Sequence, residues 1–259
     1  LDVVLFRLAL HWEKEYVMEE KIRSALAYPL VVMVVAWLAV LIFLILVLPS
    51  FQGILANMEM EMPLVTGLVL NTSLFFQKYW YLGFFLFFLT TVGFKQYLNT
   101  DSGQELWSKI VLQIPVFGGV NQKIIISRFS RTLGTLLKGG VPILQALEVS
   151  KRIADNKVVE KALTAVMAHV KDGGGVATPL AKCKVFPPMV VQMMAIGEEA
   201  GALEEMLEKI SQYYDEEVES TISRLSSILE PLLILFLGGI VGFLILAIML
   251  PMFKIIGSI

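Results

Sequence analysis

Three long apolar runs divide the chain, at residues 30–49, 78–96 and 230–253. The first and last consist almost entirely of aliphatic and aromatic side chains. The middle run is shorter and mostly aromatic, and Lys78 and Lys95 bracket it closely enough for their ammonium groups to reach the two membrane surfaces. Because about 20 apolar residues cross a bilayer, the pattern predicts three transmembrane helices.

The distribution of basic residues predicts the orientation of these helices. The segment 50–77 contains no Lys or Arg, whereas both the preceding residues 1–29 and the long segment 97–229 carry several. Lys and Arg collect on the cytoplasmic side of a membrane. We therefore expect 1–29 and 97–229 to be cytoplasmic, and the loop 50–77 and the tail 254–259 to lie on the opposite side.

The long polar segment has the periodicity of helices, and no useful stretch of it alternates as a strand does. Capping residues, prolines and glycines mark the expected ends of its helices. We expect helices from Asp101 or Ser102 to Leu112, from Asn121 to Gly139, from Pro142 past Ile153, from Asn156 to Lys171, at Thr178–Pro179, from Pro188 to Gly201, and from Leu203 toward Pro231. Helices joined by short turns predict an all-α antiparallel bundle.

The chain also contains an internal repeat. Its register pairs Leu1 with Leu203, Trp12 with Tyr214, Glu13 with Asp215, Pro29 with Pro231 and Pro49 with Pro251. In each copy an amphipathic helix leads into a membrane run. We interpret the repeat as a duplication, in which residues 1–29 are the terminal helix of a first cytoplasmic domain that is mostly missing from this sequence.

Two sets of residues in the membrane runs have candidate mechanical roles. Pro29 and Pro231 each lie where a cytoplasmic helix becomes a membrane helix, so they mark either a hinge or an ordinary helix start. Gly238, Gly239 and Gly242 leave the backbone of the third run open to close approach by another helix.

The sharpest polar feature is an acidic turn at Gly197–Leu203, in which Glu198 and Glu199 precede Gly201 and Glu204 follows. One interpretation is helix capping on a solvated face, because negative charge stabilises the first turn of a helix. The other is a contact surface for a partner. A metal site requires these carboxylates to converge, which their spacing does not guarantee.

Other chemistry finds little support. A single cysteine, Cys183, and two histidines exclude an internal disulfide and a classical zinc fold. Gly173–Gly175 lacks the Lys-Ser/Thr ending of a phosphate loop and is interpreted as a turn. A net charge of -2 disfavours nucleic acid. We predict no catalytic residues, metal or cofactor, and a small membrane transporter or channel subunit is the alternative, weakened by the lack of charges inside the runs.

Four motifs occur together in this chain: Arg128–Leu137, Gly140–Leu147, Gly197–Leu203, and Leu229–Leu233 with Gly239–Phe243. In combination they resemble the PilC/GspF family, the assembly-platform proteins of type IV pilus and type II secretion machines. The resemblance covers nearly the whole chain. It departs at the start, where the first cytoplasmic domain is reduced to its last helix, and at Ala200, where a Ser or Thr is common.

This resemblance implies a non-enzymatic protein of the bacterial inner membrane with three spans, a cytoplasmic N-terminus and a periplasmic C-terminus. Its partners would be further copies of itself, a cytoplasmic hexameric ATPase, pilin or pseudopilin helices and other membrane subunits of the machine. Glu198, Glu199, Gly201 and Glu204 are the residues on which we place a partner contact.

Overall fold

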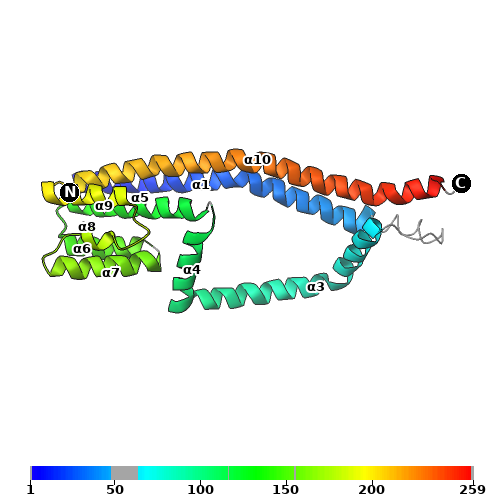
Figure 1. Cartoon of the computed structure of the whole chain (residues 1–259), viewed down its shortest axis with the longest axis horizontal. Helices are drawn as coiled ribbons and strands as arrows, with labels where there is room; N and C mark the ends of the chain where they lie inside the picture. The colour runs from blue at the N-terminus through cyan, green and yellow to red at the C-terminus, as the bar shows by residue number, and fades with distance from the viewer. Residues whose placement is uncertain (1, 48–63, 116, 155, 258–259) are drawn as a thin grey trace. The chain divides into compact units, whose positions relative to one another are not determined.

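The computed structural model describes residues 2–47, 64–115, 117–154 and 156–257 (Figure 1). All regular structure in this part is helical, which confirms the all-α prediction. The helices are α1 (Asp2–Ile42), a π-helical continuation η1 (Phe43–Val47), α3 (Leu64–Leu98), α4 (Asp101–Gln113), α5 (Phe117–Lys138), α6 (Ile143–Ile153), α7 (Lys157–Lys171), α8 (Ala177–Leu180), α9 (Pro188–Ala200) and α10 (Leu203–Gly257).

Two compact units share these helices. The first contains Leu1–Ile22 and Phe94–Ser223, and the second contains Arg23–Gly93 and Arg224–Ile259. The chain is helical where α1 and α10 pass from one unit into the other.

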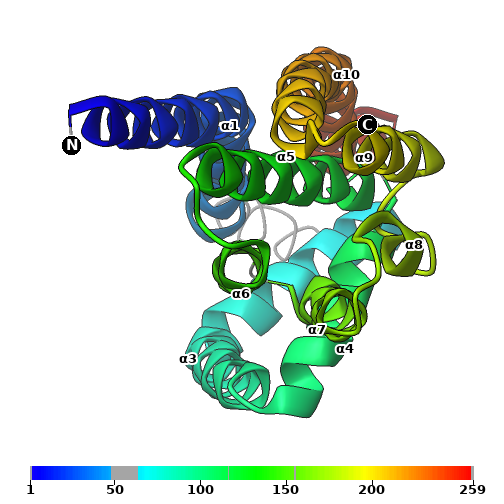
Figure 2. The same ribbon diagram turned by 90° about the vertical axis from the view of Figure 1, so that its left-hand side faces the viewer.

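The first unit is a bundle of short helices around one hydrophobic core (Figure 2). Helix α5 packs on α4 and α6, α7 packs on α4, α6 and α8, and α9 packs on α8. Every helix from α5 to α10 contributes fully buried side chains, among them Phe129, Leu133, Leu147, Leu163, Leu180, Met194, Leu207 and Ile210. The spacing of three or four residues within each helix puts these side chains on one face, which is the physical basis of the bundle.

The predicted helix ends at glycines are confirmed. Helix α5 ends at Lys138, and Gly140 follows with a φ of +79°, a conformation that glycine adopts without a Cβ clash. The predicted turn at Gly173–Gly175 is also present, since the Gly174 N–H donates to the carbonyl of His169 over 2.9 Å.

Three predicted helix starts are wrong. Helix α4 is capped by Thr100, whose hydroxyl accepts from Gly103 N over 3.1 Å, and not by Asp101 or Ser102. Helix α5 begins at Phe117 instead of Asn121, because the turn after Pro115 already closes with a bond from Gly118 N to Ile114 O. The short helix α8 begins at Ala177, before the predicted cap.

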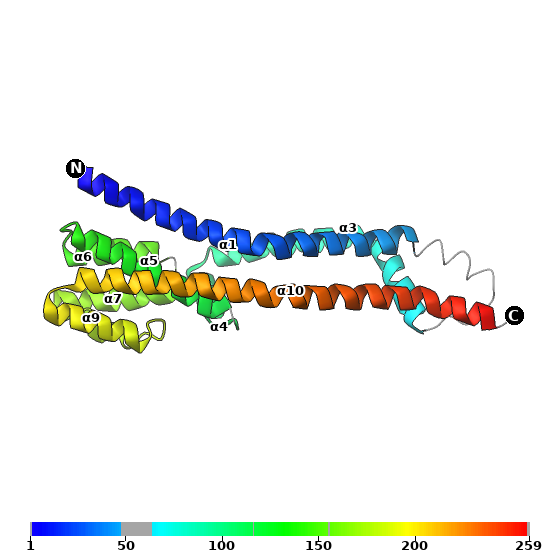
Figure 3. The ribbon, with the colours of Figure 1, turned by 90° about the horizontal axis from the view of Figure 1, so that it is seen from above.

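The second unit pairs the end of α1 with the end of α10 (Figure 3). Residues 32–40 of α1 line a groove with residues 233–240 of α10, and farther along both helices Leu44 packs on Ala247. Because residue numbers rise together on the two sides, the paired segments run parallel. Ser73 of α3 donates a 2.6 Å hydrogen bond to the carbonyl of Leu44 in the π-helical segment.

Two stretches of the described chain, Glu20–Val47 and Leu203–Leu250, are long and apolar enough to cross a bilayer. The number rises to three if the pair α4 and α5, bent by 110°, is taken as one span. The predicted middle span, residues 78–96, forms part of the continuous helix α3, where side chains such as Phe84 and Phe87 are about two-thirds exposed.

Pro29 and Pro231 both lie inside continuous helices. The interpretation of either proline as a helix start is therefore wrong. Each proline removes one backbone donor from its helix, and the helix continues past it because the flanking turns keep their bonds. Pro29 is buried and Pro231 is exposed.

Candidate functional site

The acidic turn is a tight connection between α9 and α10. Gly201 ends α9 with a φ of +66°, and the Ala202 N–H donates to Gly197 O over 2.8 Å, as in a Schellman turn. A Cβ added at Gly197 would lie 3.0 Å from Leu203 Cα and from Met206 Cγ. The turn thus brings the first residues of α10 against the last turn of α9, and glycine is required for both the turn and the contact.

Glu198 points from this turn into the bundle. Its carboxylate accepts hydrogen bonds from the backbone N–H groups of Val176 and Ala177, the latter at 3.1 Å. These N–H groups open α8, so Glu198 caps a helix that lies 21 residues away in the sequence. The half-buried carboxylate is therefore a structural partner of α8.

Glu199 is exposed, whereas Glu204 is half-buried like Glu198. Within the described chain, neither Glu199 nor Glu204 nor Glu205 makes a hydrogen bond or an ion pair, whereas Glu208 pairs with Lys138 at 2.8 Å. The structure thus brings all the predicted acidic residues to one turn but gives them different surroundings. No three His, Cys, Asp or Glu side chains among the described residues are placed to hold a metal ion.

Sequence reasoning missed a ladder of polar contacts that joins α5 to α10. The described contacts run from Lys123 with Glu217 at 2.6 Å, through Arg131 with Asp215, to Lys138 with Glu208. Arg131 also bonds to Ser211, and Ser127 donates to Asp215. Residue numbers rise along α5 while those of the partners fall along α10, so the two helices run antiparallel at these contacts. The sequence pattern that could have predicted the ladder is a basic residue about every two turns of α5, at Lys123, Arg131 and Lys138, beside the buried positions.

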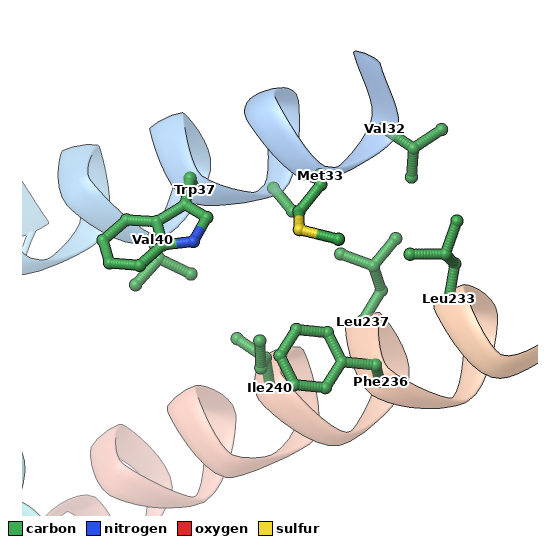
Figure 4. Close-up of a pocket in the computed structure, with 9 residues that line it drawn as sticks. Val32, Met33, Trp37, Val40, Leu233, Phe236, Leu237 and Ile240 are labelled. Carbon is green, nitrogen blue, oxygen red and sulfur yellow. The ribbon is translucent and has the colours of Figure 1, made fainter. Parts of the chain in front are cut away.

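The second unit holds an apolar groove of about 150 Å³ between α1 and α10 (Figure 4). Met33, Trp37 and Val40 line it from α1, and Leu233, Phe236 and Ile240 line it from α10. All nine lining side chains are hydrocarbon, thioether or indole, so the groove suits an apolar occupant.

Gly238, Gly239 and Gly242 lie away from this groove. At 3.6 residues per turn they fall about 100° to 180° round α10 from Leu233, Leu237 and Ile240. A Cβ added at any of the three would meet nothing within 4 Å in the described chain. Their predicted role in helix packing is therefore not exercised inside this unit and stays a prediction for contact with another chain.

Comparison with known proteins follows this architecture. The family model described as "Type II secretion system (T2SS), protein F" matches residues 1–49 and 129–251. These two stretches end at Pro49 and Pro251, which the internal repeat pairs, and the duplication itself stays a prediction.

Curated relatives match along the whole chain. It is 39% identical over 259 residues to the type IV pilus assembly protein PilC of Myxococcus xanthus and to that of Thermus thermophilus, and 30% identical over 257 residues to type II secretion system protein F of Aeromonas hydrophila. The match covers 98% to 100% of this chain but only 62%, 64% and 66% of those proteins. The chain belongs to the type II secretion system protein F family, which includes pilus assembly proteins of the PilC type.

Proposed function

We propose that the chain is part of an inner-membrane assembly platform that couples a cytoplasmic motor ATPase to the movement of pilin or pseudopilin subunits. The names of its relatives place them in pilus assembly and type II secretion. The observation that carries the mechanical role is α10, which runs unbroken from the acidic turn through a membrane-length apolar stretch. A displacement at the turn can be transmitted along such a helix.

The proposal includes three membrane spans with a cytoplasmic N-terminus. Supporting it, the apolar stretches of α1 and α10 run parallel, with Leu44 of one on Ala247 of the other. If both cross the membrane in the same direction, the chain between them must cross back an odd number of times. The exposed aromatic run of α3 is the segment suited to that return.

Self-association through the spans is the second part of the proposal. The face of α1 that lines the groove, Met33, Ala36 and Val40, corresponds in the repeat to Leu235, Gly238 and Gly242 of α10. The groove face of α10 corresponds to Val31, Val35 and Leu38 of α1, which are more than half exposed. Both equivalent faces are therefore available, and a second copy can cover them by repeating the contact seen within one chain. Such head-to-tail contacts build rings when the rotation closes.

The acidic turn is the third part, as a contact for the motor or for a neighbouring subunit. Glu199 and Glu204 are the residues to test, because neither is engaged elsewhere in the described chain. Glu198 is different, since its carboxylate already holds the start of α8.

The experiment compares two variants of the full-length protein in its own cells. Glu199→Lys with Glu204→Lys should abolish pilus or secretion output, because it reverses charge at a contact without breaking a bond within the bundle. The charge reversal in the first turn of α10 should lower the free energy of unfolding by at most about 1 kcal/mol. The matched control, Glu198→Gln, should lower the free energy of unfolding by about 0.5 to 2 kcal/mol through loss of the cap. Normal output from the double-Lys variant would reject the partner contact.

A further inference from the structure

Helix α4 has one face committed to the bundle. Its Ser108 hydroxyl accepts a hydrogen bond from Lys157 N over 3.2 Å at the start of α7, and Leu112 packs against the core. The charged row of α4 is turned toward α7 as well, since Glu105 pairs with Lys161 at 2.6 Å. The position of α4 against α5 and α7 is therefore fixed by polar and apolar contacts together.

The outer face of α4 is apolar, which is unusual for a helix at the edge of a bundle. Leu106, Ile110 and Ile114 follow one another at the four-residue spacing of a helix face and are 50%, 41% and 37% exposed. Trp107 beside them and Phe117 at the start of α5 are exposed as well. No charged residue interrupts this stripe, so water would contact a continuous hydrocarbon surface.

The stripe continues onto the end of α3. Phe94 and Trp107 form an edge-to-face pair with ring centroids 5.4 Å apart, and both Phe94 and Tyr97 are about half exposed. A Cβ added at Gly103 would lie 2.0 Å from Tyr97 O. The close approach of α4 to the end of α3 therefore depends on glycine at that position.

We propose that α4 is an interfacial helix whose stripe of Leu106, Trp107, Ile110 and Ile114 lies in the headgroup region of the cytoplasmic leaflet. This inference rests on the proposed span in α3. Only Asn99 and Thr100 separate α3 from α4, and a fully extended chain advances about 3.6 Å per residue, so α4 must begin within roughly 11 Å of the end of α3, which lies just past the proposed span.

The chemistry of the stripe fits this depth. Amphipathic helices that lie in the membrane plane bury the apolar face about 5 to 10 Å into the boundary between headgroups and acyl chains. Trp and Tyr prefer the same level, because the rings are apolar and the N–H or O–H still finds water. With its charged row held by α7, α4 then connects the bundle rigidly to the bilayer surface.

The test measures the depth of Trp107 in the full chain reconstituted into phosphatidylcholine vesicles. Trp12, Trp37 and Trp80 are changed to Phe, which leaves Trp107 as the one fluorescent tryptophan among the four in the chain. Lipids with a nitroxide near the headgroup should quench it more than lipids with a nitroxide near the chain end. Iodide should quench it several-fold less than a tryptophan placed on α9 by Gln192→Trp in the same background with Trp107→Phe.

Each outcome separates the inference from the proposed topology. A second reporter, Phe87→Trp in the background with no other tryptophan, should be quenched most by the deep nitroxide. If Phe87→Trp behaves so while Trp107 is open to iodide, or is shielded from both iodide and lipid by protein, the interfacial helix is rejected and the span in α3 stands. If lipid quenches neither reporter, the span in α3 fails and the inference fails with it.

Discussion

Glu198 and Glu199 are neighbours in the sequence, yet their carboxylates differ in exposure and in hydrogen bonding. One helical step of about 100° turns Glu198 toward the N–H groups of Val176 and Ala177 and leaves Glu199 in solvent. The two carboxylates therefore have different surroundings: Glu198 caps α8, and Glu199 makes no hydrogen bond or ion pair within the described chain.

Glu105 provides a pH-dependent prediction at the same scale. Hydrogen bonds from Lys161 at 2.6 Å and Lys109 at 2.9 Å, reinforced by their charges, lower the pKa of Glu105 from 4.5 to about 2. Because the pKa is lower in the folded state, the ionised carboxylate stabilises the bundle above about pH 4.5, and this contribution disappears as the pH falls toward 2.

Replacing Glu105 with Gln should therefore lower stability at neutral pH and flatten its dependence on pH in this window. The measurement is a series of urea unfolding curves of the full chain in detergent between pH 2 and pH 5. The same series is recorded for Asp172→Asn, whose carboxylate is exposed and makes no hydrogen bond or ion pair within the described chain. If the free energy of unfolding depends on pH in the same way for the Glu105 variant and for the unmodified chain, the lowered pKa of Glu105 is contradicted.

Residue-level prediction from sequence succeeds where the cause is local. The end of α9 at Gly201 follows from the need for a left-handed residue, and the start of α7 follows from Asn156, whose side chain accepts from Val158 N. The cap of α8 cannot be found this way, because its acceptor, Glu198, comes from another helix. Helix ends that are capped by residues distant in the sequence cannot be predicted from residue spacing.

At the scale of elements, the pairing of α5 with α10 is the contact that ties the acidic turn to the bundle. Leu133 and Leu207 are fully buried, and a Cβ at Gly134 would lie 3.1 Å from Leu207 Cβ. Around this close approach, Arg131 and Asp215 are the most buried ion pair of the ladder, with side chains 11% and 21% exposed.

Breaking this pair should cost far more than breaking an exposed one. Asp215→Asn leaves the Arg131 guanidinium nearly buried without its counter-charge, so we expect a loss of about 3 kcal/mol or more in the free energy of unfolding. Glu208→Gln, which breaks the half-exposed pair with Lys138, should cost at most about 1 kcal/mol. Denaturant unfolding of both variants tests the ranking, and equal losses would remove the special role of Arg131.

The bundle itself was predictable because hydrophobic periodicity reports which face of each helix is buried. The ladder was not predictable from the sequence. Arg131 and Asp215 cannot be told apart from solvated charged residues until α10 is placed beside α5. The same limit applies to the outer face of α4. Leu106 and Ile110 look like core positions in the sequence, and only the packing of Ser108 and Leu112 on the bundle turns them outward.

At the scale of the whole molecule, the topology is open to direct labelling. In a Cys183→Ala background, Asn57→Cys, between the first two predicted spans, and Thr164→Cys on the exposed side of α7 should react with an impermeant maleimide from opposite sides of the membrane. Thr164 is suited to this labelling because its side chain is exposed on α7. Labelling of both positions from one side would contradict the three-span proposal.

Apolar runs and a repeated register were enough to predict where the long helices lie, because both are properties of a single stretch of sequence. The apolar runs alone did not predict which faces of α1 and α10 pack against each other. In a helix that is apolar on all sides, no polar residue marks which side meets a neighbour, so the parallel seam from Leu233 to Ala247 against α1 emerges only from the packed structure.

The last prediction concerns how copies of the chain associate through those faces. Because the α1 face that binds α10 is equivalent in the repeat to Leu235, Gly238 and Gly242, that face of α10 should bind α1 of a second copy. Helices in lipid associate mainly through close packing, since burial in a neighbour removes no water. Gly238→Leu with Gly242→Leu fills the open surface and should dissociate the oligomer, while the fold survives because a Cβ added at either position meets no other residue within 4 Å in the described chain.

The matched control is Val241→Leu, which adds a methylene at a half-exposed position on a different side of the same helix. Cross-linking in native membranes and light scattering in detergent should then show the control assembling like the unmodified chain and the double variant reduced to smaller species. If both variants keep the same oligomer, the glycine face of α10 is not the contact, and the repeated pairing of α1 with α10 is confined to the single chain.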